Sequence, residues 1–311
     1  MTSTLGPDAV ATYGGIVALE RTGDTFSGVC HGGRDESRGY GGSVLAHGLA
    51  AAHATVPDDR AVHSLHAYFL RAVDSTAPMD FGVTTIRDGR SYSVRRVDAQ
   101  QPDTQQPDAQ QPDTQQPDAR PPAGQQRGRP TFTMTTSFKR PQPGAHERSA
   151  VLDLGAVPGP DGLPDGFGDR SPHSPVRELL ECREAPAVGG VPPSGELVRD
   201  AWFRLRHPLG DEDVAHVCGL AYLSDVTLTP TAFLRLPGGV RSERSLIASL
   251  DHAMWFHRPA RADRWLLYRQ RSRIEADGRT FARGELWQDG ELVASVAQEA
   301  LLHIPDDSAD A

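Results

Sequence analysis

Apolar and polar positions along the chain form two blocks that repeat one order of elements. In the first block, apolar residues recur at helical spacing over residues 41–56. Patterns typical of strands follow at 61–70, 80–89, 90–99 and 129–138. The second block begins with a helical spacing at 211–225. Its strand patterns lie at 245–257, 264–274, 278–288 and 291–302.

The two blocks also resemble each other in their residues. "HSLHAYFLR" resembles "ASLDHAMWFHR", "RDGRSYSVRRV" resembles "ADGRTFARGEL", and "TFTMTTSF" resembles "LVASVAQEAL". The pairs Asp88-Gly89 and Asp289-Gly290 separate strand patterns and are typical of two-residue hairpin turns. We therefore expect two halves, each with one helix followed by four or five antiparallel strands.

A polar repeat interrupts the first block. Four tandem copies of Gln-Gln-Pro-Asp followed by Thr or Ala run from Gln100 to Ala119. The matching position of the second block holds the Asp289-Gly290 turn, so the duplication places the repeat inside a hairpin, between strands that end near Ala99 and begin near Thr131. Its composition predicts an extended, disordered loop.

The same comparison predicts the domain organisation. Residues 141–195 lack a sustained period and are rich in Pro and Gly, which favours a linker with one short helix. We expect a first domain at 1–140 with the insertion at 100–129, the linker at 141–195, a second domain at 196–305 and a disordered tail at 306–311.

Composition excludes several classes of protein. The net charge of −9 argues against non-specific nucleic-acid binding, because no basic excess exists to neutralise phosphates. Cys30, Cys182 and Cys218 fit no metal-ligand spacing and indicate a reducing compartment. The start "MTSTLGPDAV" lacks the features of a signal peptide, and no apolar run is long enough to span a membrane. We expect a cytoplasmic protein without a metal site.

Several motifs, in order, resemble those of the acyl-CoA thioesterase II family. They include "VHSLHAYFLR", "RDGRSYSVRRV", "PGPDGLP", "LAYLSD", "SLDHAMWFHRP" and "LVASVAQEAL", and the resemblance extends from about Gly28 to Leu302. It implies an α+β double-hotdog fold, in which each half wraps a curved antiparallel sheet around one long helix. It also implies hydrolysis of acyl-CoA without a metal or organic cofactor, in a homo-oligomer.

The resemblance further implies a catalytic trio in the second half. The family's Asp, hydroxyl residue and Gln match Asp225, Ser249 and Gln298 of this sequence. A carboxylate at the end of a buried helix can orient a water molecule, and a Gln can both donate and accept hydrogen bonds. We expect direct attack by water, with backbone N–H groups near Gly41 and Gly42 as one possible source of oxyanion donors.

Other polar residues have plausible roles in binding or in structure. Arg90, Arg95, Arg96 and Arg258 are candidate donors to the phosphates of CoA. His252 and His257 lie five residues apart on a predicted strand, so they should face opposite sides of the sheet. We expect structural roles for both histidines.

Three rival functions differ from this prediction in their sequence requirements. An α/β-hydrolase needs Gly-x-Ser-x-Gly, and the stretch from Gly41 to Leu45 fails at its last position. A hotdog hydratase needs a His beside a carboxylate, but His216 lies about two and a half helical turns from Asp225. A non-catalytic acyl-thioester-binding module is the remaining alternative.

Overall fold

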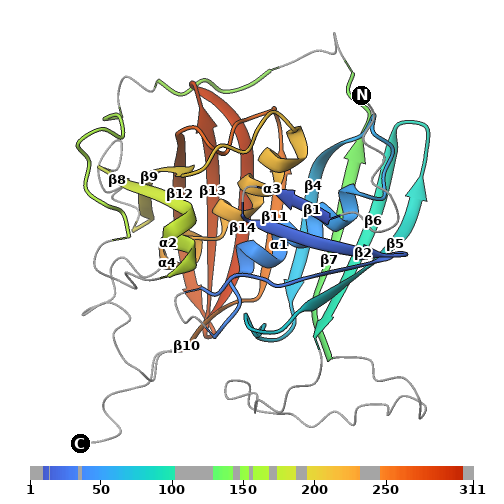
Figure 1. Ribbon diagram of the computed structural model, residues 1–311. Helices are drawn as coiled ribbons and strands as arrows, with labels where there is room; N and C mark the ends of the chain where they lie inside the picture. Colours follow the sequence, from blue (N-terminus) through green and yellow to red (C-terminus); the bar gives the residue numbers. More distant parts are fainter. Residues whose placement is uncertain are drawn as a thin grey trace, which may run out of the picture.

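A single antiparallel sheet contains strands from both halves of the chain, and two helices pack against one of its faces (Figure 1). The computed structural model describes residues 10–13, 15–33, 37–101, 129–142, 148–153, 157–167, 174–186, 195–231 and 246–303. In this part of the chain the sheet has 14 strands. Their order is β1-β2-β3-β5-β6-β7-β4-β11-β14-β13-β12-β9-β8, with β10 paired to β14.

The strands of the two halves meet in the middle of the sheet. The first half supplies β1 (Val10–Tyr13), β2 (Val17–Thr22), β3 (Thr25–Gly28), β4 (Ala61–Phe69), β5 (Met79–Asp88), β6 (Tyr92–Gln101) and β7 (Arg129–Lys139). The second supplies β8 (Leu180–Ala185), β9 (Leu197–Leu205), β10 (Leu246–Ser249), β11 (Asp251–Phe256), β12 (Leu266–Ala276), β13 (Arg279–Gln288) and β14 (Glu291–His303). Strand β4 pairs with β11, where the fully buried Leu65 and Met254 lie opposite each other.

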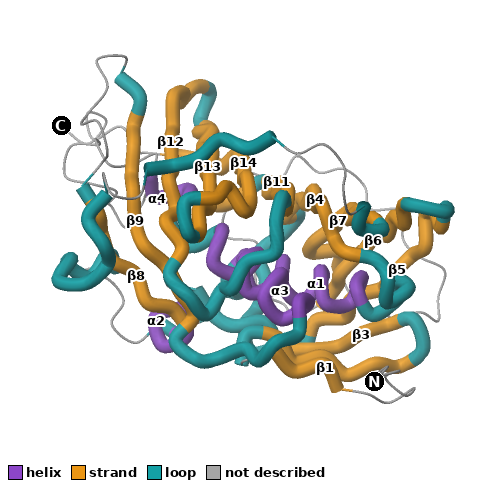
Figure 2. Tube along the Cα trace, turned by 90° about the horizontal axis from the view of Figure 1, so that it is seen from above, coloured by secondary structure: helices purple, strands orange, loops and turns teal. Residues whose placement is uncertain are grey.

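Two helices lie side by side within the curve of the sheet, as Figure 2 shows. They are α1 (Gly41–His53) and α3 (Asp213–Ser224), which run in opposite directions, so that the start of α1 meets the end of α3. Every residue of α1 from Gly42 to Ala52 is buried, and most of them are small or apolar, as a helix buried on all sides requires. Each half thus has the predicted helix and antiparallel strands.

The segment predicted as a linker contains two regular elements. Helix α2 (Pro175–Leu179) leads directly into β8, which pairs with β9 at the edge of the sheet. Strand β8 has only six residues and its alternation of buried and half-buried positions is interrupted, so it gives no clear period between loops rich in Pro and Gly. A further short helix, α4 (Leu228–Thr231), follows α3.

Turn predictions agree with the structure in one half and not in the other. Asp289 and Gly290 have φ of 53° and 83° and join β13 to β14, as predicted. The two-residue turn at Asp88-Gly89 is wrong, because β5 ends at Asp88 and β6 begins only at Tyr92. The hairpin is nevertheless present, closed by a hydrogen bond from the Gly89 N–H to the Tyr92 carbonyl (2.8 Å).

The strands on either side of the polar repeat extend into the segment 100–129 that was predicted as the insertion, since β6 includes Gln100 and Gln101 and β7 begins at Arg129. Strands β6 and β7 are antiparallel neighbours, and Gln101 at the end of β6 pairs with Arg129 at the start of β7. Residues 102–128, where a disordered loop is expected, lie outside the described part of the chain, and so does the expected tail at 306–311.

Candidate active site

Asp225 lies where the two halves of the molecule meet. It directly follows the last residue of α3, and its side chain faces the first turn of α1. The Gly42 N–H of α1 donates to Asp225 Oδ2 at 3.1 Å. Residue Tyr40, which precedes α1, makes no side-chain cap, so the carboxylate of the second half satisfies a free N–H at the start of the first half's helix.

The three predicted catalytic side chains are brought together by hydrogen bonds. The amide Nε2 of Gln298 donates to Asp225 Oδ1 at 2.6 Å and to Ser249 Oγ at 2.9 Å. The Ser249 hydroxyl forms a hydrogen bond to Asp225. Gln298 lies on β14 and Ser249 on β10, so two strands and the end of α3 build one cluster.

The orientation of the Gln298 amide follows from its neighbours. The ionised Asp225 carboxylate can only accept, which places the amide nitrogen toward it and leaves Gln298 Oε1 to accept the Thr229 hydroxyl of α4 at 3.0 Å. Both amide hydrogens therefore point at protein acceptors. In this arrangement the Gln298 amide holds Asp225 and Ser249 in place.

Ser249 reaches the cluster because the predicted strand at 245–257 is broken. In β11 the even-numbered His252 and Met254 face the core, so strict alternation would turn Ser249 to the outer face. Instead Ser249 pairs with Ala300, whereas Ala253 pairs with Ala297, a register change of one residue. The Asp251 side chain accepts the Glu299 N–H at 2.6 Å across the break. A continuous strand was therefore the wrong prediction here.

Burial dominates the electrostatics of Asp225. Desolvation raises the pKa of its carboxyl group above the ordinary value, and hydrogen bonds from Gln298, Gly42 and Ser249 oppose this rise. The end of α3 disfavours a negative charge, whereas the start of α1 favours one. The carboxylate is thus held in a buried position with a raised affinity for a proton, as general-base chemistry requires.

His252 is a neighbour of this cluster that sequence reasoning assigned only a structural role. The ring is 1% exposed, its Nδ1 lies 4.0 Å from Asp225 Oδ1, and its Nε2 lies 2.9 Å from Ser224 Oγ. His257, in contrast, faces outward and contacts Ser295 Oγ at 2.9 Å, so the prediction of opposite faces is confirmed. In the sequence His252 lies three residues after Ser249, and on a continuous strand these two side chains would face opposite sides. The break in the strand turns both toward the core, so the sequence did not indicate that they lie together.

Gly41 and Gly42 lie at the closest contact between the two halves. A Cβ atom at Gly42 would lie 2.2 Å from the Tyr222 carbonyl oxygen, and one at Gly41 would lie 2.8 Å from Asp225 Oδ2. Only glycine allows the helix start to approach the carboxylate this closely. Since the Gly42 N–H already donates to Asp225, it is not free for an oxyanion in this arrangement.

The four arginines predicted to bind phosphate lie apart from the cluster's hydrogen bonds. Arg95 is 2% exposed and donates to both carboxylate oxygens of Asp88 and to Thr55, which makes it a structural residue. Arg96 pairs with Asp98 at the surface, and Arg258 Nε lies 4.0 Å from Glu291. Arg90 is exposed in the connection between β5 and β6.

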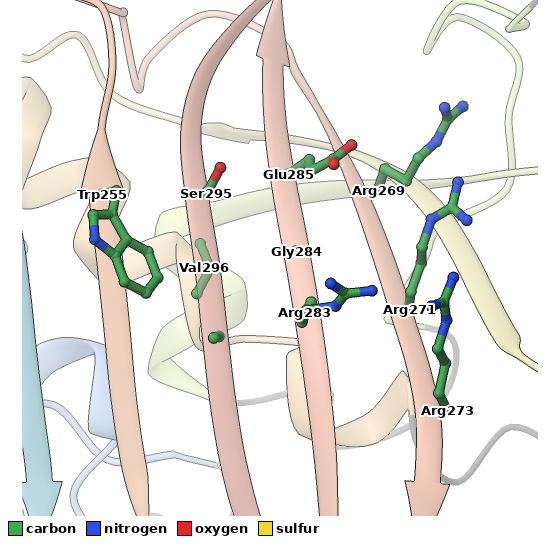
Figure 3. A pocket seen from close by; sticks show the side chains of 10 residues that line it. Trp255, Arg269, Arg271, Arg273, Arg283, Gly284, Glu285, Ser295 and Val296 are labelled. Atoms are coloured by element: carbon green, nitrogen blue, oxygen red, sulfur yellow. The ribbon is translucent and has the colours of Figure 1, made fainter.

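A different set of arginines lines a hollow of about 410 Å³ on the outer face of the sheet (Figure 3). Ser295 and Ala297 of β14 line it, whereas Gln298 next to them faces the core. Around them stand Trp255, Arg269, Arg271, Arg273 and Arg283. Arg269 pairs with Asp200, and Arg271 and Arg273 pair with Glu196. The hollow is therefore separated from Asp225 by the sheet itself.

The described residues contain no group of three or more His, Cys, Asp or Glu side chains that could hold a metal ion. Within the same ranges, no helix has the length and apolarity needed to cross a membrane.

Comparison with known proteins agrees with this architecture. The family model of the acyl-CoA thioesterase N-terminal domain matches residues 35–139, and that of the C-terminal domain matches residues 151–302. Acyl-coenzyme A thioesterase 8 of Mus musculus is 32% identical over 285 residues, which cover 85% of this chain and 80% of the mouse protein. Acyl-CoA thioesterase 2 of Haemophilus influenzae is 28% identical over 283 residues, with 86% and 88% covered.

Solved structures give the same result for the fold. The crystal structure of acyl-CoA thioesterase II TesB2 from Mycobacterium marinum superposes with a TM-score of 0.72 at 35% identity, covering 94% of this chain and 98% of that one. A hot dog fold protein from Alicyclobacillus acidocaldarius superposes with a TM-score of 0.66 at 21% identity, with 93% and 97% covered. The predicted double hotdog is thereby confirmed. With both domain models matched in order along one continuous sheet, this chain belongs to the acyl-CoA thioesterase family.

Proposed function

We propose that the protein hydrolyses the thioester of acyl-CoA to a free carboxylic acid and CoA, by direct attack of a water molecule that Asp225 activates. The observation that carries this proposal is the buried carboxylate of Asp225, held by Gly42, Ser249 and Gln298. The family membership and the acyl-CoA thioesterase names of its relatives support the substrate class.

The proposed reaction needs no covalent enzyme intermediate. Asp225 accepts one proton from water while the water oxygen forms a bond to the thioester carbonyl carbon. The tetrahedral intermediate then collapses, the carbon–sulfur bond breaks, and the proton passes from Asp225 to the departing thiolate of CoA. Ser249 and Gln298 hold the carboxylate in one orientation throughout, because each donates a hydrogen bond to it.

The developing oxyanion needs donors that are directed at it before the reaction. Gly41 is the first residue of α1, so its N–H has no carbonyl partner within the helix. The positive end of the helix dipole also lies at this point. We assign the Gly41 N–H to the oxyanion and the Gly42 N–H to Asp225. The exposed Arg90 and Arg96 and the half-buried Arg258 are retained as candidate phosphate donors, and the buried Arg95 is not.

The variant Asp225→Asn tests the base directly. Asn caps helices about as well as Asp, so the variant preserves the contact with α1 while it removes the ability to accept a proton. We expect kcat to fall between about 100-fold and 10,000-fold with butyryl-, decanoyl- or palmitoyl-CoA as substrate.

A matched control is Asp74→Asn, because Asp74 Oδ1 also accepts a backbone N–H, that of Thr76 at 2.8 Å, but lies outside the cluster. This variant should hydrolyse acyl-CoA at nearly the wild-type rate. Undiminished hydrolysis by Asp225→Asn would remove the proposed base.

The alternative, a non-catalytic acyl-thioester-binding module, predicts a different result for the wild-type protein. Such a module would bind acyl-CoA measurably and hydrolyse none of the three substrates. The intact cluster of Asp225, Ser249 and Gln298 favours the enzyme.

We also propose a cytoplasmic location and a homo-oligomer. Cys30, Cys182 and Cys218 are free and buried, which is compatible with a reducing compartment. Tyr68 and Trp255 lie exposed on adjacent central strands, at 58% and 37%, where a second copy of the chain could pack. Sedimentation velocity distinguishes the oligomer from a monomer.

A further inference from the structure

We propose that His252 is a positioning residue, whose Nδ1 atom together with Asp225 Oδ1 holds the attacking water molecule. The inference rests on the proposed function, and it adds a fourth side chain to the predicted trio. It follows from the contacts of the imidazole ring and from the acceptors that Asp225 still has available.

The hydrogen bonds of Ser224 determine which nitrogen of His252 carries the hydrogen. The Ser224 hydroxyl donates to the Ala221 carbonyl at 2.9 Å, so its single hydrogen is used. The His252 Nε2 atom lies 2.9 Å from the same oxygen and must therefore be the donor. The ring is then the Nε2–H tautomer, and Nδ1 has an unshared electron pair.

That electron pair faces the carboxylate of Asp225. Nδ1 is buried without a hydrogen-bond partner in the described part of the chain, and it lies 4.0 Å from Asp225 Oδ1. Two acceptors cannot bond to each other directly. A water molecule at about 2.8 Å from both atoms would donate one hydrogen to each and keep its own electron pairs for the attack.

The remaining contacts of Asp225 leave room for one such hydrogen bond. A carboxylate offers about four acceptor positions, and three are filled by Gly42, Ser249 and Gln298. The fourth is the one available to a water molecule. Leaving a buried acceptor such as His252 Nδ1 without a donor would cost about 1–3 kcal/mol.

His47 shows what a purely structural histidine looks like in this fold. It is equally buried in α1, but its Nδ1 lies 2.8 Å from the Ser43 carbonyl and its Nε2 accepts the Ala18 N–H at 3.4 Å. Both ring nitrogens of His47 are satisfied within the protein. His252 differs in that one nitrogen is satisfied and the other points at the proposed base.

The imidazole takes no proton in this scheme. Burial lowers the pKa of His252 to about 3, so the ring stays neutral at the pH values at which Asp225 is ionised and active. The proton goes from water to Asp225, and the water oxygen goes to the thioester carbon. His252 only fixes the second O–H bond of the water and thereby the direction of its electron pairs.

Two substitutions separate positioning from structural support. Asn carries its oxygen on Cγ, where the imidazole carries Nδ1, so His252→Asn keeps an acceptor beside Asp225 and loses the contact with Ser224. His252→Gln extends its amide nitrogen toward the place of Nε2, so it keeps the contact with Ser224 and loses the acceptor. We expect His252→Gln to lower kcat about tenfold relative to His252→Asn, with similar KM for decanoyl-CoA.

The opposite order would overturn the proposal. If His252 only supports the end of α3, the Gln variant should be the more active of the two. His257→Gln is the matched control, because this histidine faces the outer side of the sheet. It should leave kcat unchanged.

A measurement on the wild-type protein covers the case in which neither variant folds. Nitrogen-15 NMR of labelled histidine distinguishes an unprotonated Nδ1 from an unprotonated Nε2. We expect His252 as the Nε2–H tautomer at neutral pH, and an Nδ1–H tautomer would refute the water position. Because this readout needs no activity, it separates failure of the inference from failure of acyl-CoA hydrolysis, which the wild-type assay detects.

Discussion

At the scale of single residues, Asp225 serves two helices at once. It ends α3, where the helix dipole opposes a negative charge, and it caps the start of α1, where the dipole favours one. The sequence pattern at 211–225 indicates only the first of these effects, because it places Asp225 at the end of one helix. The contact with Gly42, 183 positions away, explains why a carboxylate is stable there.

The balance of burial and hydrogen bonding at Asp225 predicts the pH dependence of the reaction. Burial raises the pKa of the carboxyl group above its ordinary value of 3.8, and the proposed mechanism requires the ionised form. As pH falls through this raised pKa, Asp225 gains a proton and kcat/KM decreases. We therefore expect the acidic limb of the kcat/KM profile at a pH above 3.8.

Ser249→Ala should shift the acidic limb of the kcat/KM profile to a higher pH. The Ser249 hydroxyl lowers the pKa of Asp225 by stabilising the charged form, so its loss makes the carboxyl group bind its proton more tightly. Ser295→Ala is the control, because Ser295 lies on β14 but contacts His257 on the outer face. A limb that stays in place in Ser249→Ala would mean that another group controls the profile.

At the scale of secondary-structure elements, the sequence predicted which segments pair but not how each one begins or bends. Hydrophobic alternation and the internal duplication were sufficient for α1, α3 and the central strands, because these segments have a clear period. The break between β10 and β11 has no such signal, since "IASLDHAM" contains neither Gly nor Pro. A hydrogen bond from the Glu299 N–H to the Asp251 carboxylate, distant in sequence, stabilises the break.

Much of the candidate site was predictable for a different reason. Asp225, Ser249 and Gln298 came from ordered motifs that resemble a known family, and the structure places them within hydrogen-bonding distance. The role of His252 was not visible, because it depends on the hydroxyl orientation of Ser224 and on the inward turn of Ser249.

The hairpin of β6 and β7 predicts where the polar repeat can be removed. Gln101 is 6% exposed, accepts the Asp74 N–H at 2.9 Å and donates to the Asp74 and Ala77 carbonyls. A short Gly-containing turn in place of residues 102–128 keeps these bonds. We expect this variant to retain wild-type kcat and to unfold at an equal or slightly higher temperature, because closing a shorter loop costs less entropy.

A deletion that also removes Gln101 is the comparison. It should lower the unfolding temperature, because the Asp74 and Ala77 carbonyls lose their shared donor. If the first variant failed to fold, residues 102–128 would do more than connect the two strands, which would contradict this prediction.

At the scale of the whole molecule, the two halves are joined by more than the sheet. The Tyr40 hydroxyl donates to the Tyr222 carbonyl at 2.6 Å, next to the bond between Gly42 and Asp225. A side chain at Gly42 would collide with both Tyr40 and the Tyr222 carbonyl. The geometry of the site therefore depends on how closely α1 and α3 approach.

Gly42→Ala should weaken the molecule and the site together. We expect a loss of about 1–3 kcal/mol in the free energy of unfolding and a decrease in kcat, since the helix start must move away from Asp225. Gly82→Ala is the control, because the nearest atom to its new Cβ would be 3.7 Å away. Urea unfolding and steady-state kinetics of both variants measure the difference, and an unaffected Gly42→Ala would contradict the close approach.

The packing of α1 against α3 also bears on how such a chain can evolve. Both helices contain Gly-Leu-Ala, at Gly48 and at Gly219, and six residues after each glycine stand Ala54 and Asp225. In a dimer of two identical chains, both helices would carry the same residue at this position, either Ala or Asp. Covalent fusion of two such copies lets one helix end lack the acid while the other keeps it, so the proposed mechanism gives each chain a single reaction centre and leaves the other half free to diverge.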